Sequence, residues 1–159
     1  MSANAGPALL TRLRWWHLDE VLAIERAVFA RRPWTSEQFF AELAGVPGTR
    51  HYVAAGTPDG VVIGYAGLAA TDDAADVMTL AVAPEHQGTG VGRAMLENLL
   101  EDAARRGVHE VFLEVDADDD AAIGLYESFG FRSIAWRRDY YAPGVDGLVM
   151  RRRGQWPSS

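Results

Sequence analysis

The chain has 159 residues, of which 48% are hydrophobic and 23% charged, as in one ordinary globular domain. It contains no cysteine, which excludes a disulfide framework, a thiolate metal site and a cysteine nucleophile. The formal net charge of −7 argues against nucleic-acid binding, and no stretch reaches the roughly 18 apolar residues of a membrane span. We therefore expect a cytoplasmic protein without a signal peptide, a metal, or a nucleic-acid or membrane partner.

The spacing of apolar residues predicts a strand, two helices and three strands in the first half of the chain. In chain order these are a strand over 9–15, a helix over 17–29, a second helix that starts after Thr35 within 31–43, and strands over 51–56, 61–70 and 76–82. The second helix has a clear start signal. Thr35 and Gln38 stand at the positions of a capping box, and Trp34 and Phe39 at those of a hydrophobic staple.

The second half predicts a helix, a strand, a helix and a strand pair. A helix follows the glycines at 88–92 and ends at Gly107, with Glu101–Arg105 and Asp102–Arg106 spaced as ion pairs. The remaining elements are a strand over 110–115, a helix over 119–129 and strands over 131–141 and 146–152. The order β-α-α-β-β-β-α-β-α-β-β predicts an α/β (α+β) fold, with a mixed, mostly antiparallel sheet and helices on both faces. A doubly wound fold would alternate strand and helix throughout.

Three glycines within five positions, Gly88, Gly90 and Gly92, lead directly from a strand region into a helix. Glycine weakens regular structure, so this cluster indicates that something approaches the backbone closely. The first N–H groups of a helix have no partner within the helix and favour negative charge. The segment is therefore typical of a phosphate-binding site, and a flexible loop with a helix cap is the alternative.

Two other phosphate-binding motifs fit less well. A P-loop requires Gly-Lys-Ser/Thr, and no lysine stands here. A dinucleotide-binding turn, G-x-G-x-x-G, requires a third glycine. That position is occupied by Arg93 if the motif begins at Gly88, and by Met95 if it begins at Gly90. Glu114 nevertheless stands near the end of the next strand, where such a turn has an acid that binds ribose. A nicotinamide-dinucleotide-binding oxidoreductase therefore stays open as an alternative.

The segment Gln87-x-x-Gly90-x-Gly92, preceded by LAVAPEH, resembles the coenzyme A loop of the GCN5-related N-acetyltransferases (GNAT). The later LEV…AAIGLYESFGF resembles the second half of that family, and the resemblance covers nearly the whole chain. PWTSEQFFAEL and RRDYYAPGVDGLVM resemble RimI-type members, which acetylate the N-terminal alanine of a small-subunit ribosomal protein. The resemblance implies a single GNAT domain over 9–153, an N-terminal extension over 1–8 and a tail over 154–159.

The resemblance also implies acetyl-CoA as cosubstrate and assigns residues to it. The loop that receives the diphosphate comprises Gln87, Gly88, Thr89, Gly90, Val91, Gly92 and Arg93. The pantetheine arm would pair with the backbone of Leu80, Ala81 and Val82. Asp119 stands where the family has an asparagine that contacts the cofactor. Because an ionised aspartate cannot donate a hydrogen bond, this position departs from the family pattern.

Glu114 resembles the family's general base and Tyr126 its general acid. Residue alternation places Glu114 with Phe112 on one face of its strand, where a structural ion pair is the alternative role. Tyr126 shares a helical stripe with Ala122 and Phe129, where a core tyrosine with a satisfied hydroxyl is the alternative.

The resemblance places Trp34, Tyr140 and Tyr141 at the entrance for the acceptor amine. The acidic run over 116–120 is typical of a solvated loop with a helix cap, and it also suits a basic peptide. We expect direct acetyl transfer to the α-amine of a protein N-terminus. The alternatives are acetylation of lysine or of a small-molecule amine, and an acyl-CoA-binding module without catalysis. The sequence does not indicate the oligomeric state.

Overall fold

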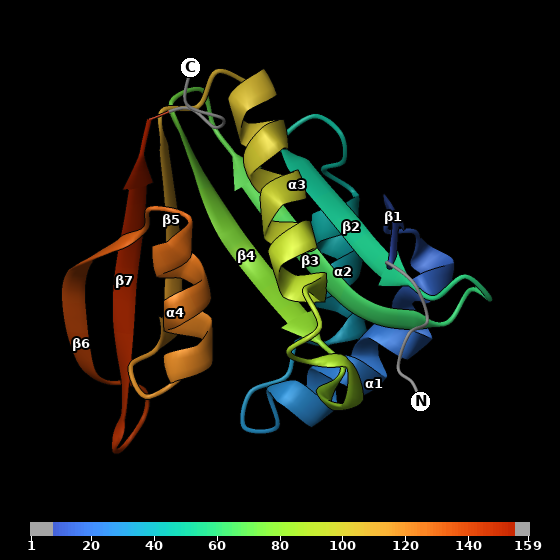
Figure 1. Cartoon of the computed structure of the whole chain (residues 1–159), viewed down its shortest axis with the longest axis horizontal. Coiled ribbons are helices and arrows are strands. Elements are labelled where there is room, and N and C mark those ends of the chain that lie inside the picture. Colours follow the sequence, from blue (N-terminus) through green and yellow to red (C-terminus); the bar gives the residue numbers. More distant parts are fainter. Residues whose placement is uncertain (1–7, 155–159) are drawn as a thin grey trace. The chain divides into compact units, whose positions relative to one another are not determined.

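The computed structural model describes residues 8–154, and its elements follow the predicted order (Figure 1). They are β1 (Leu9–Arg12), η1 (Trp15–His17), α1 (Leu18–Val28), α2 (Ser36–Leu43), β2 (Arg50–Gly56), β3 (Val62–Ala70), β4 (Ala74–Val82), η2 (Pro84–His86), α3 (Val91–Arg105), β5 (Glu110–Asp116), α4 (Asp120–Ser128), β6 (Arg132–Ala142) and β7 (Val145–Arg153). The two short 3-10 helices, η1 and η2, were not predicted. The proposed extension and tail lie almost wholly outside the described residues.

Within the described residues the strands have the order β1-β2-β3-β4-β5-β7-β6. β4 and β5 are parallel, whereas the pairs β1–β2, β2–β3, β5–β7 and β6–β7 are antiparallel. The prediction of a mixed, mostly antiparallel sheet is therefore confirmed. No helix of the described chain is long and apolar enough to cross a membrane.

The chain divides into two compact units. The first unit comprises the residues up to Ala69 together with Met78–Leu100, and so holds β1 to β3, α1, α2, the end of β4 and most of α3. The second unit comprises Ala70–Val77 and the residues from Glu101 on, and so holds the start of β4, β5, α4, β6 and β7.

In the first unit, β3 is buried along nearly its whole length because helices cover both of its faces. Consecutive residues of a strand face opposite sides. On one side the Tyr65 ring contacts the Phe39 ring of α2, with centroids 5.7 Å apart. On the other side, a Cβ added to Gly64 would lie 3.0 Å from Met95 Cε of α3. Figure 1 shows α3 on one face of β3 and α1 and α2 on the other. The predicted placement of helices on both faces is confirmed for this unit.

The start of α2 has the predicted capping box and staple. The Gln38 N–H donates to Thr35 Oγ1 at 3.2 Å, and the Thr35 N–H donates to Gln38 Oε1 at 2.8 Å. The rings of Trp34 and Phe39 have centroids 5.0 Å apart. The helix therefore begins where the local sequence alone places it.

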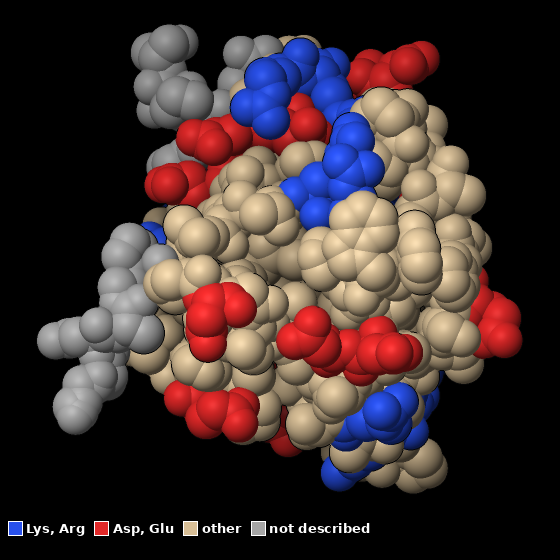
Figure 2. Space-filling model, turned by 90° about the vertical axis from the view of Figure 1, so that its right-hand side faces the viewer, with Lys and Arg blue, Asp and Glu red and all other residues tan. Residues whose placement is uncertain are grey.

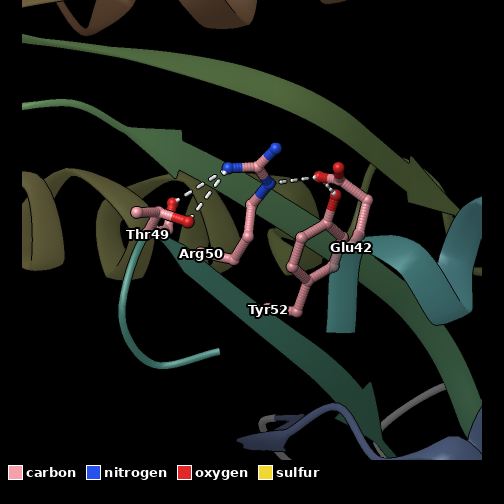
Figure 3. A network of polar contacts seen from close by, with 4 residues as sticks. All are labelled: Glu42, Thr49, Arg50 and Tyr52. Atoms are coloured by element: carbon pink, nitrogen blue, oxygen red, sulfur yellow. Dashed lines mark hydrogen bonds and ion pairs between the residues drawn. The ribbon is translucent and has the colours of Figure 1, made fainter. Parts of the chain in front are cut away.

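Glu42 joins α2 to β2 (Figure 3). Its Oε1 accepts from Arg50 Nε at 2.9 Å and from the Tyr52 hydroxyl at 2.5 Å. Arg50 Nη1 also donates to the Thr49 carbonyl and hydroxyl oxygens, each at 3.3 Å. Burial raises the pKa of Tyr52, so its hydroxyl stays protonated and continues to donate to Glu42.

A second buried carboxylate, Glu25 of α1, holds the segment that precedes α2. Glu25 is 2% exposed, and it accepts the Trp34 N–H at 2.9 Å and the Tyr65 hydroxyl. Because two donors lose their partner together, we expect Glu25→Ala to lower the free energy of unfolding by about 2–4 kcal/mol. Urea unfolding measures this, with the exposed Glu37→Ala as control. Equal unfolding midpoints for both variants would contradict this role.

One of the two predicted ion pairs on α3 is confirmed, and the other is wrong. Arg106 Nε lies 2.6 Å from Asp102 Oδ2, as predicted. Arg105 Nη2 lies 3.5 Å from Asp102 Oδ1, so its partner is three residues away and is not Glu101. Residues three and four apart share one face of a helix, so the single carboxylate of Asp102 lies within reach of both guanidinium groups.

Charged side chains form separate small groups on the face drawn in Figure 2. Arginine groups (blue) alternate there with acidic groups (red), and uncharged residues fill most of the area between them. This face does not have the continuous basic surface that favours binding to nucleic acid.

Candidate active site

The glycine-rich loop of the first unit is folded back onto the end of β4. Gln87 Nε2 donates to the Val82 carbonyl at 3.1 Å, and the Thr89 hydroxyl donates to the His86 carbonyl at 2.6 Å. Gln87 therefore anchors the loop through its side chain, and its predicted contact with the coenzyme stays a prediction.

Backbone conformation, and not crowding, requires glycine in this loop. Gly88 and Gly90 have φ angles of +77° and +93°, where other residues are strained. A Cβ added at either position would meet no protein atom within 4 Å. The loop therefore leaves open space directly above its backbone.

The N–H groups of residues 88–92 are available to a ligand. The first hydrogen bond of α3 runs from the Ala94 N–H to the Gly90 carbonyl, at 3.0 Å. Within the described chain, the N–H groups from Gly88 to Gly92 have no backbone or side-chain acceptor. Several adjacent N–H groups at the start of a 15-residue helix form an environment that favours an anion such as a diphosphate.

The end of β4 offers part of its backbone to an extended ligand. The register between β4 and β5 covers Ala74 to Asp76 and does not continue to Leu80. The Ala83 N–H donates to Ile63 of β3 at 2.8 Å. Because backbone groups alternate in direction, Ala81 also faces β3, whereas Leu80 and Val82 face the opposite edge. Of the three residues predicted to pair with pantetheine, two therefore point their N–H groups to this edge.

We expect Gly90→Val to lower acetyl-CoA affinity at least tenfold, because its side chain enters the open space and restricts φ. Gly60 provides a matched control, because its φ is +92° and a Cβ there also meets nothing within 4 Å. Both valine variants suffer similar backbone strain, but only Gly90→Val obstructs the loop. Calorimetric titration with acetyl-CoA measures the difference. Unchanged affinity in a folded Gly90→Val protein would show that the diphosphate binds elsewhere.

In the second unit, β5 presents Glu114 on its exposed face. Val111, Leu113 and Val115 are buried, whereas Glu114 is exposed, as the alternation predicts. No ion pair joins Glu114 to a basic residue within the described range. The structural ion-pair role therefore has no support, and the carboxylate is accessible to a substrate amine or a water molecule.

Tyr126 of α4 combines a buried ring with an unpaired hydroxyl. Its ring contacts the Phe131 ring at a centroid distance of 5.8 Å, and the residue is 8% exposed. Its hydroxyl makes no hydrogen bond to another described residue. Burial, followed by the charges of Asp119 and Tyr141, raises the pKa of Tyr126 and keeps its hydroxyl protonated. The alternative of a core tyrosine with a satisfied hydroxyl is thus not supported.

Asp119 is the N-cap of α4. Its Oδ1 accepts the Ala122 N–H at 3.1 Å, which confirms the predicted helix-capping role of the acidic run. One carboxylate oxygen is engaged in this cap. The contact of Asp119 with the cofactor stays a prediction.

The three residues predicted to contact the acceptor lie in different units. Trp34 belongs to the first unit, is half-buried, and is held at its backbone by Glu25. Tyr140 and Tyr141 belong to β6 of the second unit, and their ring centroids are 4.9 Å apart. The second unit brings Tyr126, Asp119 and Tyr141 within electrostatic range of one another.

Two carboxylates that shape these segments were not predicted as functional. Glu25 stands in an otherwise apolar helical stripe, and this mismatch was a visible signal in the sequence. Asp146 contacts the segment that carries Tyr140 and Tyr141, but no local pattern in the sequence indicates this.

Comparison with known proteins assigns the chain to a family. The sequence model of the Acetyltransferase (GNAT) family matches residues 11–131. N-alpha-acetyltransferase RimI of Mycobacterium tuberculosis is 38% identical over 99% of this chain and 100% of its own length. The crystal structure of the ribosomal-protein-S18-alanine N-acetyltransferase from Escherichia coli superposes with a TM-score of 0.82, at 30% identity, covering 96% of this chain and 97% of that one.

A third similarity concerns the fold alone. A phosphinothricin acetyltransferase of the GNAT superfamily from Sinorhizobium meliloti, solved in complex with acetyl-CoA, has a TM-score of 0.82 at 20% identity. The alignment covers 94% of this chain and 90% of that chain. With a family match over most of its length and a full-length relative of this kind, the chain belongs to the GNAT family and is an N-acetyltransferase.

Proposed function

We propose that this protein transfers the acetyl group of acetyl-CoA to the α-amine of an N-terminal alanine in a small-subunit ribosomal protein. The observation that carries the proposal is the series of unpaired N–H groups from Gly88 to Gly92 at the start of α3. This arrangement favours the diphosphate of a coenzyme. We further propose that the reaction takes place in the cytoplasm, where ribosomal proteins are made.

The choice of acceptor rests on the relatives. The E. coli structure similar to this chain is that of a ribosomal-protein-S18-alanine N-acetyltransferase. The mycobacterial relative is an N-alpha-acetyltransferase. In this chain, Tyr140 and Tyr141 supply aromatic surface, and the acidic residues Asp118 and Asp120 are exposed at the start of α4. These features suit a short peptide that carries positive charge.

The chemistry requires a neutral amine, but a protein α-amine has a pKa of roughly 7.7–8.0. Glu114 accepts the amine proton, directly or through water, as the nitrogen attacks the acetyl carbonyl. The Val82 N–H, which faces the open edge of β4, stabilises negative charge that develops on the carbonyl oxygen. As the new C–N bond forms, the C–S bond breaks, and the Tyr126 hydroxyl donates to the departing sulfur. One proton leaves the amine nitrogen and one proton ends on the sulfur of free coenzyme A, so the reaction is balanced.

Acetylation of a lysine or a small amine is the competing function inside the family. The exposed position of Glu114 does not select an α-amine over a lysine amine, so the choice depends on the peptide entrance. Because the chain is an N-acetyltransferase, the oxidoreductase and the non-catalytic module are no longer competing functions.

A substrate panel tests the proposed acceptor. The panel contains peptides with alanine, serine, methionine or proline at position one, followed by basic residues, together with spermidine as a small polyamine. We expect kcat/KM to be highest for the alanine peptide, by at least about tenfold. A change of about one carbon group in a side chain that fits a pocket alters binding by about 1–3 kcal/mol. A highest value for spermidine would overturn the proposal in favour of a small-molecule acetyltransferase.

A further inference from the structure

The strand β6 carries a large bulge where it presents Tyr140 and Tyr141. In the pairing of β6 with β7, Arg137 lies opposite Gly147 and Ala142 lies opposite Val145. The four residues 138–141 of β6 therefore face a single residue of β7, Asp146. A bulge of this size loses its ladder hydrogen bonds, so other groups must fix its conformation.

The Asp146 carboxylate supplies those hydrogen bonds. Its Oδ1 accepts the Asp139 N–H inside the bulge at 2.8 Å, and its Oδ2 accepts from Trp136 Nε1 before the bulge at 2.9 Å. These two donors, with Arg138 as a weaker contributor, lower the pKa of Asp146, so it stays ionised and continues to accept both. Asp146 thus holds the two sides of the bulge at once.

Asp139 extends this network to the turn between the strands. It has a φ angle of +52°, which is uncommon for a residue other than glycine. Its Oδ1 accepts the Gly144 N–H at 2.7 Å. The uncommon backbone conformation of Asp139 is therefore supported from both sides, by Asp146 at its N–H and by the turn at its side chain.

The bulge places both tyrosine rings over Gly147. A Cβ added at Gly147 would lie 2.9 Å from Tyr140 Cδ2 and 3.1 Å from Tyr141 Cε2. The Arg137 guanidinium lies over the Tyr140 ring, 5.0 Å from its centroid. The rings thus have a defined place, next to the residue that follows Asp146.

The backbone of Asp146 contacts the loop that joins β5, which carries Glu114, to α4, which carries Tyr126. The Asp146 carbonyl accepts the Ala117 N–H at 2.9 Å, in the loop between β5 and α4. Tyr141 is close enough to contribute to the raised pKa of Tyr126. A change in the bulge is therefore expected to move the two tyrosines, which lie beside the segments that carry Glu114 and Tyr126.

We propose that Asp146 is a positioning residue for the acceptor peptide, which acts by fixing the bulge that carries Tyr140 and Tyr141. This inference rests on the proposed peptide acetylation and adds a residue that selects for the acceptor. Both carboxylate oxygens of Asp146 already accept hydrogen bonds, from Trp136 and from Asp139, so Asp146 is engaged within its own hairpin and is not assigned to the coenzyme. A substitution of Asp146 should therefore change the KM for the peptide and leave the KM for acetyl-CoA nearly unchanged.

The experiment compares Asp146→Ala and Asp146→Asn in steady-state kinetics with an alanine-start peptide. We expect Asp146→Ala to raise the KM for the peptide at least about tenfold, since two charge-assisted hydrogen bonds are lost, while the KM for acetyl-CoA stays within about twofold. Asparagine keeps one acceptor oxygen on its side chain, so Asp146→Asn should give an intermediate peptide KM and fold normally.

Glu110→Ala is the matched control. Its carboxylate accepts from Arg153 Nε at 3.3 Å, at the opposite end of β7, so it also removes a side-chain contact to that strand. We expect this variant to have the parent's KM values for both substrates, and melting temperatures are recorded for all proteins.

The outcomes separate the inference from the function on which it rests. If the parent protein acetylates none of the peptides, the proposed function is wrong. If the parent is active but Asp146→Asn and Asp146→Ala keep its peptide KM, the positioning role is wrong and the function stands. If the KM values for peptide and acetyl-CoA rise together, in step with a lower melting temperature, Asp146 is only a structural residue and the inference is overturned.

Discussion

Glu114→Gln is expected to lower kcat by about 10²–10⁴-fold at pH 7, the usual loss when a general base is removed. Glutamine keeps the shape of the side chain on the exposed face of β5 but cannot accept the amine proton. The loss should become smaller as the pH rises through about 8, because more of the substrate amine is then neutral without help. A pH profile of kcat for parent and variant measures this.

Glu110→Gln serves as the control for Glu114→Gln. Glu110 lies four residues earlier on β5, on the same face, and is paired with Arg153. It should keep the parent's kcat at every pH. If Glu114→Gln also stays within about twofold of the parent, well short of the loss expected for a general base, the assignment of Glu114 is wrong.

Tyr126→Phe is expected to lower kcat by about 10²-fold, with acetyl-CoA affinity nearly unchanged. Burial raises the pKa of Tyr126, so a full proton transfer to a thiolate of pKa near 8.5 is unfavourable. The hydroxyl should therefore act by donating a hydrogen bond to the departing sulfur. The loss should be constant with pH below about 10, where the tyrosine stays neutral.

The melting temperature distinguishes this role from a structural one. The Tyr126 hydroxyl has no partner among the described residues, so Tyr126→Phe should melt close to the parent. Tyr65→Phe is expected to give the opposite result, because the Tyr65 hydroxyl donates to the buried Glu25. That variant should melt lower and keep a near-normal kcat. A Tyr126→Phe protein that melts lower but turns over normally would contradict the catalytic assignment.

The parts of the fold that could be predicted are those in which neighbouring residues decide the structure. The capping box of Thr35 and Gln38 places the start of α2, and alternation along β5 places Glu114 on the exposed face. Both depend on spacings of two to four residues. The same alternation, applied to β4, would have separated Ala81 from Leu80 and Val82 as backbone partners for a ligand.

The parts that could not be predicted depend on the pairing of segments distant in sequence. The bulge opposite Asp146 is a property of the register between β6 and β7, and the residues of β6 alone show no sign of it. Glu25 was visible as a polar residue in an apolar stripe, but its partners Trp34 and Tyr65 are brought to it only by the packing of α1 on β3. The choice of Asp102 over Glu101 by Arg105 likewise depends on side-chain reach.

One peptide tests directly whether the acetyl group goes to an α-amine. The peptide begins with alanine and carries one internal lysine, so it offers both amines in a single molecule. The enzyme has no lysine of its own, because all 15 of its basic Lys or Arg residues are arginine. After incubation with acetyl-CoA, fragmentation mass spectrometry identifies the acetylated nitrogen. We predict acetylation of the alanine α-amine with the lysine unmodified, and acetylation of the lysine with a free N-terminus would contradict the proposed acceptor.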